Sequence, residues 1–253
     1  MNPLSWLGER IALYLQKPSG GYRSRSTCSP DALLHTIKKG DVLLVDGVSR
    51  VSQAIKYLTQ STWSHAALCI ADQYGCETPD MAKVLLLEAD VVEGVRIIPL
   101  SEYANQDTRI CRPVGLQSDD IDVVVEHAKS QLGHQYDTKN VFDLARYLIQ
   151  TPPVPVRWRR NMLSLGSGDP TRAICSSLVA QAFHRIKYPI LPEAMCADLE
   201  APGKIEVFFQ VRHHTLFVPR DFDISPYFQI IKPSLEREFN PFKFAWHDEE
   251  SDV

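Results

Sequence analysis

Short apolar runs separated by turn residues dominate the chain between residues 41 and 100. The runs are DVLLVDG, HAALCIA, KVLLLEA and VRIIPL, which begin at Asp41, His65, Lys83 and Val95. Four to eight apolar residues bounded by Gly, Pro and Asp are typical of buried strands. The last three runs are joined by DQYGCETPD and by Glu93-Gly94, so we expect them to form an antiparallel meander.

Elsewhere the apolar residues recur at helical spacing, often with a capping residue in front. Near the start, Leu4, Leu7, Ile11 and Tyr14 form one stripe behind a cap at Asn2 and Pro3. The other predicted helices run from a cap at Ser29 to Gly40, from Val51 to Thr59, and from a cap at Ser118 to Gly133. The strands and helices together predict an α+β fold.

The chain of 253 residues, 44% of them hydrophobic, is long enough to bury one sizeable core. We expect one main domain over residues 41–232, preceded by a helical extension and linker at 1–40 and followed by a tail at 233–253. Residues 151–171 contain four prolines and little periodicity, which predicts an inserted loop or lid.

Charge and hydropathy exclude several classes of partner. The net charge of -4 and the pI of about 6.1 give no general basic field, so nucleic acid is not an expected partner. No uncharged apolar run approaches the roughly 18 residues of a membrane span, and we expect a cytoplasmic protein. The helix near the N-terminus is expected to pack on its own domain, and a membrane-surface contact is the less favoured alternative.

The six cysteines include no CxxC pair, which argues against a zinc site and a disulfide framework. We therefore expect free thiols, no metal and no cofactor. The sequence does not indicate the oligomeric state.

Cys175, in RAICSSLVAQAFHRI, is the first candidate for chemistry. It precedes apolar residues at helical spacing, so its thiol is expected at the positive end of a helix, where a thiolate is stabilised. The same backbone N–H groups could hold an oxyanion. The alternative is a small buried thiol, because free cysteine is among the most buried residue types. A neighbouring base is needed to decide between them.

His65 and Glu88 are the candidate partners of Cys175. His65 opens an apolar strand, and Glu88 is a lone carboxylate within VLLLEA, where an unpaired charge would cost several kcal/mol. If Ile70 pairs with Lys83, His65 lies directly opposite Glu88, so the carboxylate would orient the imidazole ring. The alternative for His65 is a structural histidine bonded to the backbone.

Five segments in order then show a resemblance: GDVLLVDG, STWSHAALCIA, LLLEADVVEGVRIIPLSEY, QLGHQYD and ICSSLVAQAF. The chain resembles the circularly permuted papain-like cysteine hydrolases, the YiiX-like branch of the NlpC superfamily. The resemblance implies an antiparallel sheet packed against helices, with Cys175 as nucleophile, His65 as base and Glu88 as the orienting residue. It also implies that Tyr136 lies near the cysteine and helps to bind the oxyanion; a core tyrosine is the equal alternative.

The function that follows is an amidase or peptidase that works through an acyl-enzyme and acts on a peptide or another small acyl-containing substrate. Two alternatives stay open: a lipid thioesterase or acyltransferase on the same fold, and a binding module without turnover. Ser177 stands where this family often has an acidic residue, two positions after the cysteine.

Overall fold

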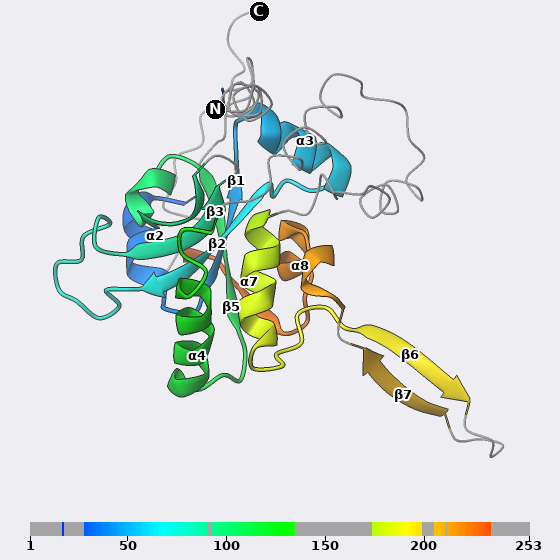
Figure 1. Cartoon of the computed structure of the whole chain (residues 1–253). Coiled ribbons are helices and arrows are strands. Elements are labelled where there is room, and N and C mark those ends of the chain that lie inside the picture. The colour runs from blue at the N-terminus through cyan, green and yellow to red at the C-terminus, as the bar shows by residue number, and fades with distance from the viewer. Residues whose placement is uncertain are drawn as a thin grey trace, which may run out of the picture.

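A six-stranded antiparallel sheet forms the centre of the computed structural model (Figure 1). Its order is β4-β3-β2-β1-β5-β8. The strands are β1 Val42–Asp46, β2 His65–Ala71, β3 Leu85–Asp90, β4 Gly94–Pro99, β5 Asp107–Pro113 and β8 Phe228–Ile231. The structure describes residue 17 and residues 28–90, 93–134, 174–198, 205–210 and 212–233. The predicted meander is confirmed, because β2, β3 and β4 pair in sequence order.

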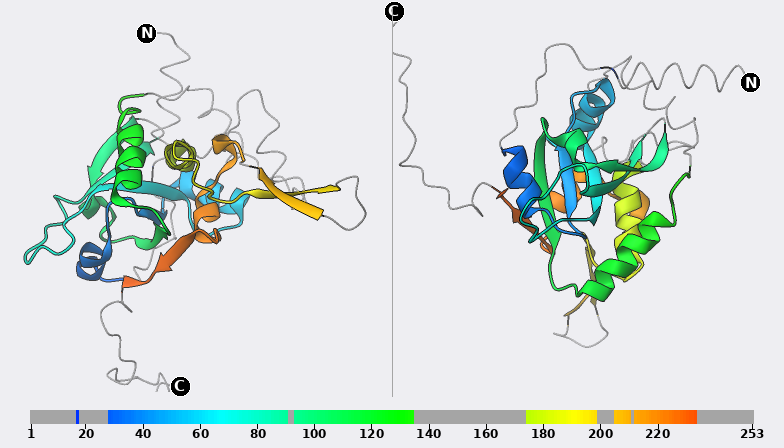
Figure 2. Two further views of the ribbon diagram at one scale, coloured as in Figure 1. Left: turned by 90° about the horizontal axis from the view of Figure 1, so that it is seen from below. Right: turned by 90° about the vertical axis from the view of Figure 1, so that its left-hand side faces the viewer.

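Helices cover both faces of this sheet (Figure 2). The α-helices are α2 Pro30–Thr36, α3 Arg50–Thr59, α4 Ser118–Lys129, α7 Ile174–His184 and α8 Pro219–Asp223. Two short 3-10 helices, η1 Leu100–Tyr103 and η2 His214–Leu216, connect elements. The architecture is α+β, as the sequence predicts.

The central strand β1 is an unbroken apolar run from Val42 to Val45 because both of its faces are buried. Val42 and Leu44 of β1 pack in the cluster that contains α4 and α7, whereas Leu43 and Val45 pack with α2 on the other face. Successive strand residues point to opposite faces, so an unbroken apolar run is what a central strand between two helical layers requires.

The helix boundaries differ from the sequence predictions by a few residues. α2 begins after its predicted cap, Ser29, but ends at Thr36 instead of Gly40, because the backbone is already extended at Ile37. Gly40 has a φ of +89° and its N–H donates to the carbonyl of Cys69, which turns the chain into β1. α4 includes the predicted cap Ser118 as a helical residue.

Two segments after α7 were not predicted correctly. A two-stranded antiparallel sheet, β6 Glu193–Asp198 and β7 Ile205–Gln210, is separate from the main sheet and was not expected from the sequence. The Pro and Asp at the start of the stretch from Pro219 are typical of a loop. The stretch instead forms helix α8, in which Pro219 occupies the first turn and Asp221 accepts from the N–H of Val218, and β8 follows.

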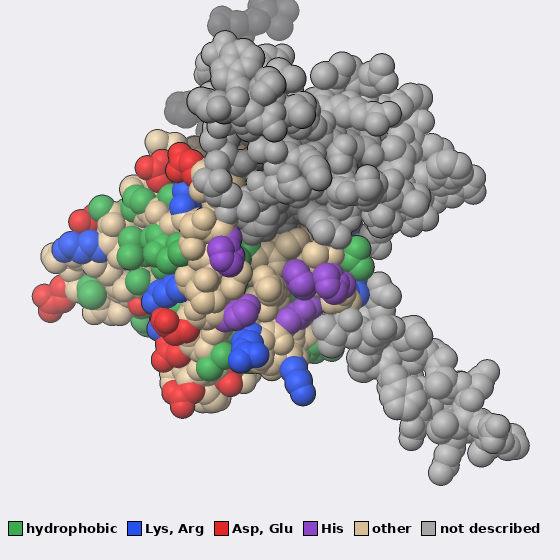
Figure 3. Space-filling model, in the orientation of Figure 1, with side chains coloured by type: hydrophobic (Ala, Val, Ile, Leu, Met, Phe, Trp, Pro, Cys, Tyr) green, Lys and Arg blue, Asp and Glu red, His purple; other side chains and the backbone are tan. Residues whose placement is uncertain are grey.

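The surface carries charges of both signs, mixed over the face that Figure 3 shows. No helix in the described part of the chain is both long and apolar enough to cross a bilayer.

Some sequence predictions fall on parts of the chain outside the described residues: the helix from Asn2 to Tyr14, the insertion at 151–171, and Tyr136. The domain limits at residues 40 and 232 stay predictions. Within the predicted extension, Leu33, Leu34 and Ile37 of the α2 region pack in the core under β1.

Candidate active site

Cys175 is the second residue of α7, and only 4% of its surface is exposed. Burial alone raises the pKa of its thiol, but the charge of His65, a hydrogen bond with His65, and the backbone N–H groups of Ala66 and Ser176 together bring the pKa below its ordinary value. These donors stabilise the thiolate, which is the nucleophilic form of cysteine. The predicted position of this residue at the start of a helix is confirmed.

His65 is the first residue of β2, at the end of the sheet where α7 also begins (Figure 1). Its Nε2 lies 2.8 Å from Oε2 of Glu88, and the ring also hydrogen-bonds to Cys175. Because an ionised carboxylate only accepts, Nε2 carries a proton, and Nδ1 is the ring nitrogen left for the thiol. Burial lowers the pKa of His65, but the charges of Cys175 and Glu88 raise it well above its ordinary value overall.

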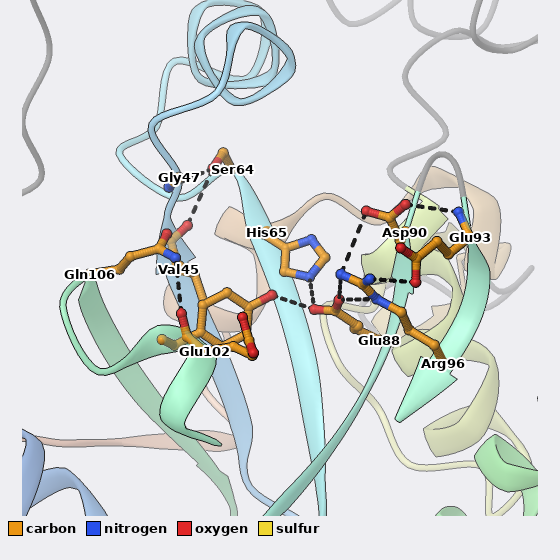
Figure 4. A network of polar contacts seen from close by, with 11 residues as sticks. Val45, Gly47, Ser64, His65, Glu88, Asp90, Glu93, Arg96, Glu102 and Gln106 are labelled. Carbon is orange, nitrogen blue, oxygen red and sulfur yellow. Dashed lines mark hydrogen bonds and ion pairs between the residues drawn. The ribbon is translucent and has the colours of Figure 1, made fainter. Parts of the chain in front are cut away.

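Glu88 lies on β3 with its side chain only 2% exposed, and four donors surround it (Figure 4). Oε2 accepts from His65 and from the hydroxyl of Tyr103, whereas Oε1 accepts from Nε of Arg96 at 2.9 Å and lies 2.8 Å from its Nη2. Burial raises the pKa of Glu88, but His65, Tyr103 and Arg96 lower it to about 2. Glu88 is therefore a charged, fully paired carboxylate.

The strand register that was predicted for this contact is wrong by two residues. Leu68 faces Leu87 and Cys69 faces Leu86, and a bulge follows before Ala71. Continuing this ladder places Glu88 opposite Ala67 and not opposite His65. A shift of two residues keeps every side chain on its predicted face, so His65 still reaches Glu88 along the diagonal.

Arg96 and Tyr103 are site residues that the sequence reasoning missed. Arg96 is the direct cross-strand neighbour of Glu88 on β4, and Tyr103 ends η1 immediately after that strand. Both lie in LLLEADVVEGVRIIPLSEY, but the sequence alone indicates no role for these two side chains. Burial and the Glu88 charge raise the pKa of Tyr103 well above its ordinary value, which keeps its hydroxyl a neutral donor.

The chain just before His65 is fixed on two sides. Ser64 is buried; its hydroxyl accepts from the N–H of Gly47 at 2.9 Å and donates to the carbonyl of Val45 at 3.3 Å. The neighbouring Trp63 donates from Nε1 to Asp223 of α8 at 3.1 Å. A Cβ on Gly47 would lie 2.8 Å from the Ser64 hydroxyl, so this approach requires glycine.

The start of α7 is held in a similar way. The hydroxyl of Ser176, which follows Cys175, is buried and donates to the carbonyl of Phe217 at 2.8 Å. α7 also packs against β2 and β3, the strands that carry His65 and Glu88. The three predicted residues Cys175, His65 and Glu88 are thus brought together on rigid elements.

Tyr136 lies outside the described residues, so the structure does not place it relative to the cysteine. Among the residues that the structure describes, no three His, Cys, Asp or Glu side chains are grouped as metal ligands.

Comparison with known families adds an independent line of evidence. Residues 36–147 match the model of the permuted papain-like amidase enzymes, the YaeF/YiiX or C92 family. The match covers less than half of the 253-residue chain. The match includes His65 and Glu88 but ends before Cys175, so the cysteine rests on its position in the structure. The match supports an enzyme of the cysteine hydrolase type, as the resemblance implied.

Among solved structures, the chain is similar to the crystal structure of metalloprotein YiiX from Escherichia coli O157:H7. It is 19% identical, with a TM-score of 0.45, and the alignment covers 77% of this chain and 96% of that one. No curated protein matches the chain.

The pairing of Glu88 predicts a pH-dependent contribution to stability. Its pKa of about 2 in the folded protein is below its ordinary 4.5, so the ionised group stabilises the fold above about pH 4.5 and this contribution is lost as the pH falls towards 2. Urea unfolding should show that the wild type loses about 2 kcal/mol more than Glu88→Gln between about pH 5 and pH 3. Glu126→Gln, at an exposed carboxylate on α4, is the control and should behave as the wild type. Parallel curves for wild type and Glu88→Gln would contradict the pairing.

Proposed function

We propose that this enzyme is an amidase or peptidase in which Cys175, His65 and Glu88 act as a Cys-His-Glu triad. The observation that carries the proposal is the continuous chain of contacts from the thiol through the imidazole to a buried, ionised carboxylate. The nucleophile, its base and the orienting group stand in the order that acyl-transfer catalysis requires.

The proposed reaction begins with a thiolate–imidazolium pair. Sγ of Cys175 attacks the carbonyl carbon of an amide, and the oxyanion that forms is held by backbone N–H groups at the start of α7. Nδ1–H of His65 gives its proton to the leaving amine as the carbon–nitrogen bond breaks, which leaves a thioester on Cys175. His65 then takes a proton from water, and the resulting hydroxide attacks the carbonyl carbon of the thioester. The carbon–sulfur bond breaks, the carboxylic acid is released, and Cys175 returns to the thiolate beside the imidazolium of His65.

Glu88 has a supporting part in this cycle. It receives Nε2–H, which fixes the ring tautomer and directs Nδ1 towards the thiol. Its negative charge also stabilises the imidazolium that forms whenever the thiol is ionised. Tyr136 keeps its proposed part as a further oxyanion donor.

The substrate is proposed to be a peptide or a small molecule with an acyl group, because the family is one of amidases. Three statements stay predictions from the sequence. The protein is expected in the cytoplasm, it is not expected to bind nucleic acid, and contact of its N-terminal helix with a membrane surface is the less favoured alternative.

The test is to trap the acyl-enzyme by intact mass. The protein is incubated with a short peptide p-nitrophenyl ester or with palmitoyl coenzyme A, and peptide mapping locates the adduct. We expect a transient peptidyl adduct on Cys175, none on Cys175→Ala, and an unchanged yield with Cys76→Ser, which removes an exposed thiol. A palmitoyl adduct alone would favour the lipid thioesterase or acyltransferase, and no adduct from either donor would favour the binding module.

A further inference from the structure

Arg96 contacts Oε1 of Glu88, whereas His65 contacts the other carboxylate oxygen, Oε2 (Figure 4). We propose that Arg96 is a positioning residue that leaves one oxygen of Glu88 to His65 and balances the charge of the catalytic cluster. This inference rests on the proposed triad and adds a residue that acts through Glu88.

The geometry supports the positioning part. Glu88 and Arg96 are direct partners in the ladder between β3 and β4, so their side chains leave the sheet on the same face. Nε and Nη2 of Arg96 both approach Oε1, at 2.9 and 2.8 Å. A planar guanidinium with two contacts on one oxygen fixes the rotation of the carboxylate, and Oε2 is then directed at the Nε2 of His65.

The charges support the second part. A thiolate at Cys175, an imidazolium at His65 and a carboxylate at Glu88 sum to one negative charge in a buried site. The guanidinium of Arg96 brings this sum to zero. Burying a net charge is unfavourable, so without Arg96 the site would bind a proton more readily and the thiolate would form at a higher pH.

Two further carboxylates lie beside Arg96, so the loss of Arg96 can only make the local charge more negative. Asp90 and Glu93 face Arg96 at 3.8 and 2.7 Å, and their side chains are 18% and 63% exposed. Solvent therefore screens the Glu93 contact. Tyr103 contributes a neutral hydroxyl to Oε2. The titratable groups that face one another here are Cys175 on α7, His65 on β2, Glu88 and Asp90 on β3, Glu93 in the β3–β4 turn, Arg96 on β4 and Tyr103 on η1.

A purely structural Arg96 predicts the opposite result. If Arg96 only braced the sheet, its loss would displace Glu88 from His65. The imidazolium would then lose the charge that stabilises it, and the titration of His65 would move to lower pH. Charge balance predicts that the loss of Arg96 moves both titrations to higher pH.

The experiment measures two midpoints that need no substrate. The rate of iodoacetamide alkylation at Cys175 against pH gives thiolate formation, and the NMR shifts of the His65 ring give loss of the imidazolium. For Arg96→Met we expect both midpoints to rise by about one pH unit, the effect of removing one nearby charge. Arg96→Lys keeps the charge and should restore the wild-type midpoints. Glu93→Gln, at the exposed neighbour, is the matched control and should leave them unchanged.

Glu88→Gln and the double variant Glu88→Gln/Arg96→Met complete the cycle. The single variant should lower both midpoints, and the double variant should return them towards the wild type. Removing both partners of a buried ion pair is often tolerated, so this comparison still tests Arg96 if Arg96→Met alone does not fold. Midpoints that fall or do not move when Arg96 is removed overturn the inference. A wild-type Cys175 whose thiolate forms only at the ordinary pKa of cysteine overturns the proposed triad instead.

Discussion

Cys175→Ser is expected to lower acyl transfer from p-nitrophenyl acetate by at least about 10³-fold. The serine hydroxyl fills nearly the same volume in the first turn of α7, so the fold should persist. His65 and the N–H groups of Ala66 and Ser176 favour the thiolate of Cys175, but a serine hydroxyl is far too weak an acid to ionise in the same setting. Release of p-nitrophenol in the first turnover and in the steady state measures the effect.

The other thiols give this prediction its controls. Burial raises the pKa of Cys69 and of Cys111, so these thiols stay protonated, and Cys76 is exposed. Cys76→Ser should therefore keep the wild-type rate. Limiting iodoacetamide at about pH 6 should label Cys175 first, as a stabilised thiolate requires. A wild-type rate for Cys175→Ser, or first labelling at another cysteine, would rule out Cys175 as the nucleophile.

The sequence was sufficient to predict the sheet and the place of Cys175. Unbroken apolar runs such as VLLV and AALCI indicate strands with two buried faces, and the structure has helices on both sides. Ser29 and the residues after Cys175 marked helix starts through capping and spacing, which depend on local chemistry alone. Such local patterns predict these strands and helix starts correctly because no contact with a distant part of the chain changes the local conformation.

The contacts that complete the site could not be predicted in the same way. The register of β2 on β3 depends on a bulge near Ile70, and no turn between the strands is short enough to fix the register from the sequence. The face of Glu88 was nevertheless right, because an error of two residues preserves the alternation. Arg96 and Tyr103 reach Glu88 only once β4 and η1 are placed, so their roles depend on tertiary structure.

The missed hairpin has a different cause. β6 and β7 pair with each other and lie outside the main sheet, so the strands are not required to show the continuous apolar pattern of a core strand. Residues such as Glu193 and Asp198 at its ends obscured the alternation. Helix α8 is short, and its Pro and Asp are equally typical of a loop.

Glu88→Gln is expected to lower kcat/KM for the same ester by about 10²-fold or more, because it removes the charge that stabilises the imidazolium of His65. The amide has a single acceptor oxygen, whereas Glu88 offers one oxygen to Arg96 and the other to His65 and Tyr103. One of these donor sets must therefore lose its acceptor. If the amide oxygen stays with Arg96, its NH₂ group faces Nε2 of His65, and the ring must turn or change tautomer.

The loss should appear in kcat as well as in kcat/KM, because the imidazolium is needed after substrate has bound. Asp90→Asn is the matched control, since Asp90 lies on the same strand and on the same face as Glu88, and its carboxylate lies 3.8 Å from the guanidinium of Arg96. It should retain most of the activity. If Asp90→Asn is as damaging as Glu88→Gln, the negative charge that His65 requires comes from the whole acidic end of β3. If Glu88→Gln is fully active, the buried carboxylate serves the sheet and has no part in the reaction.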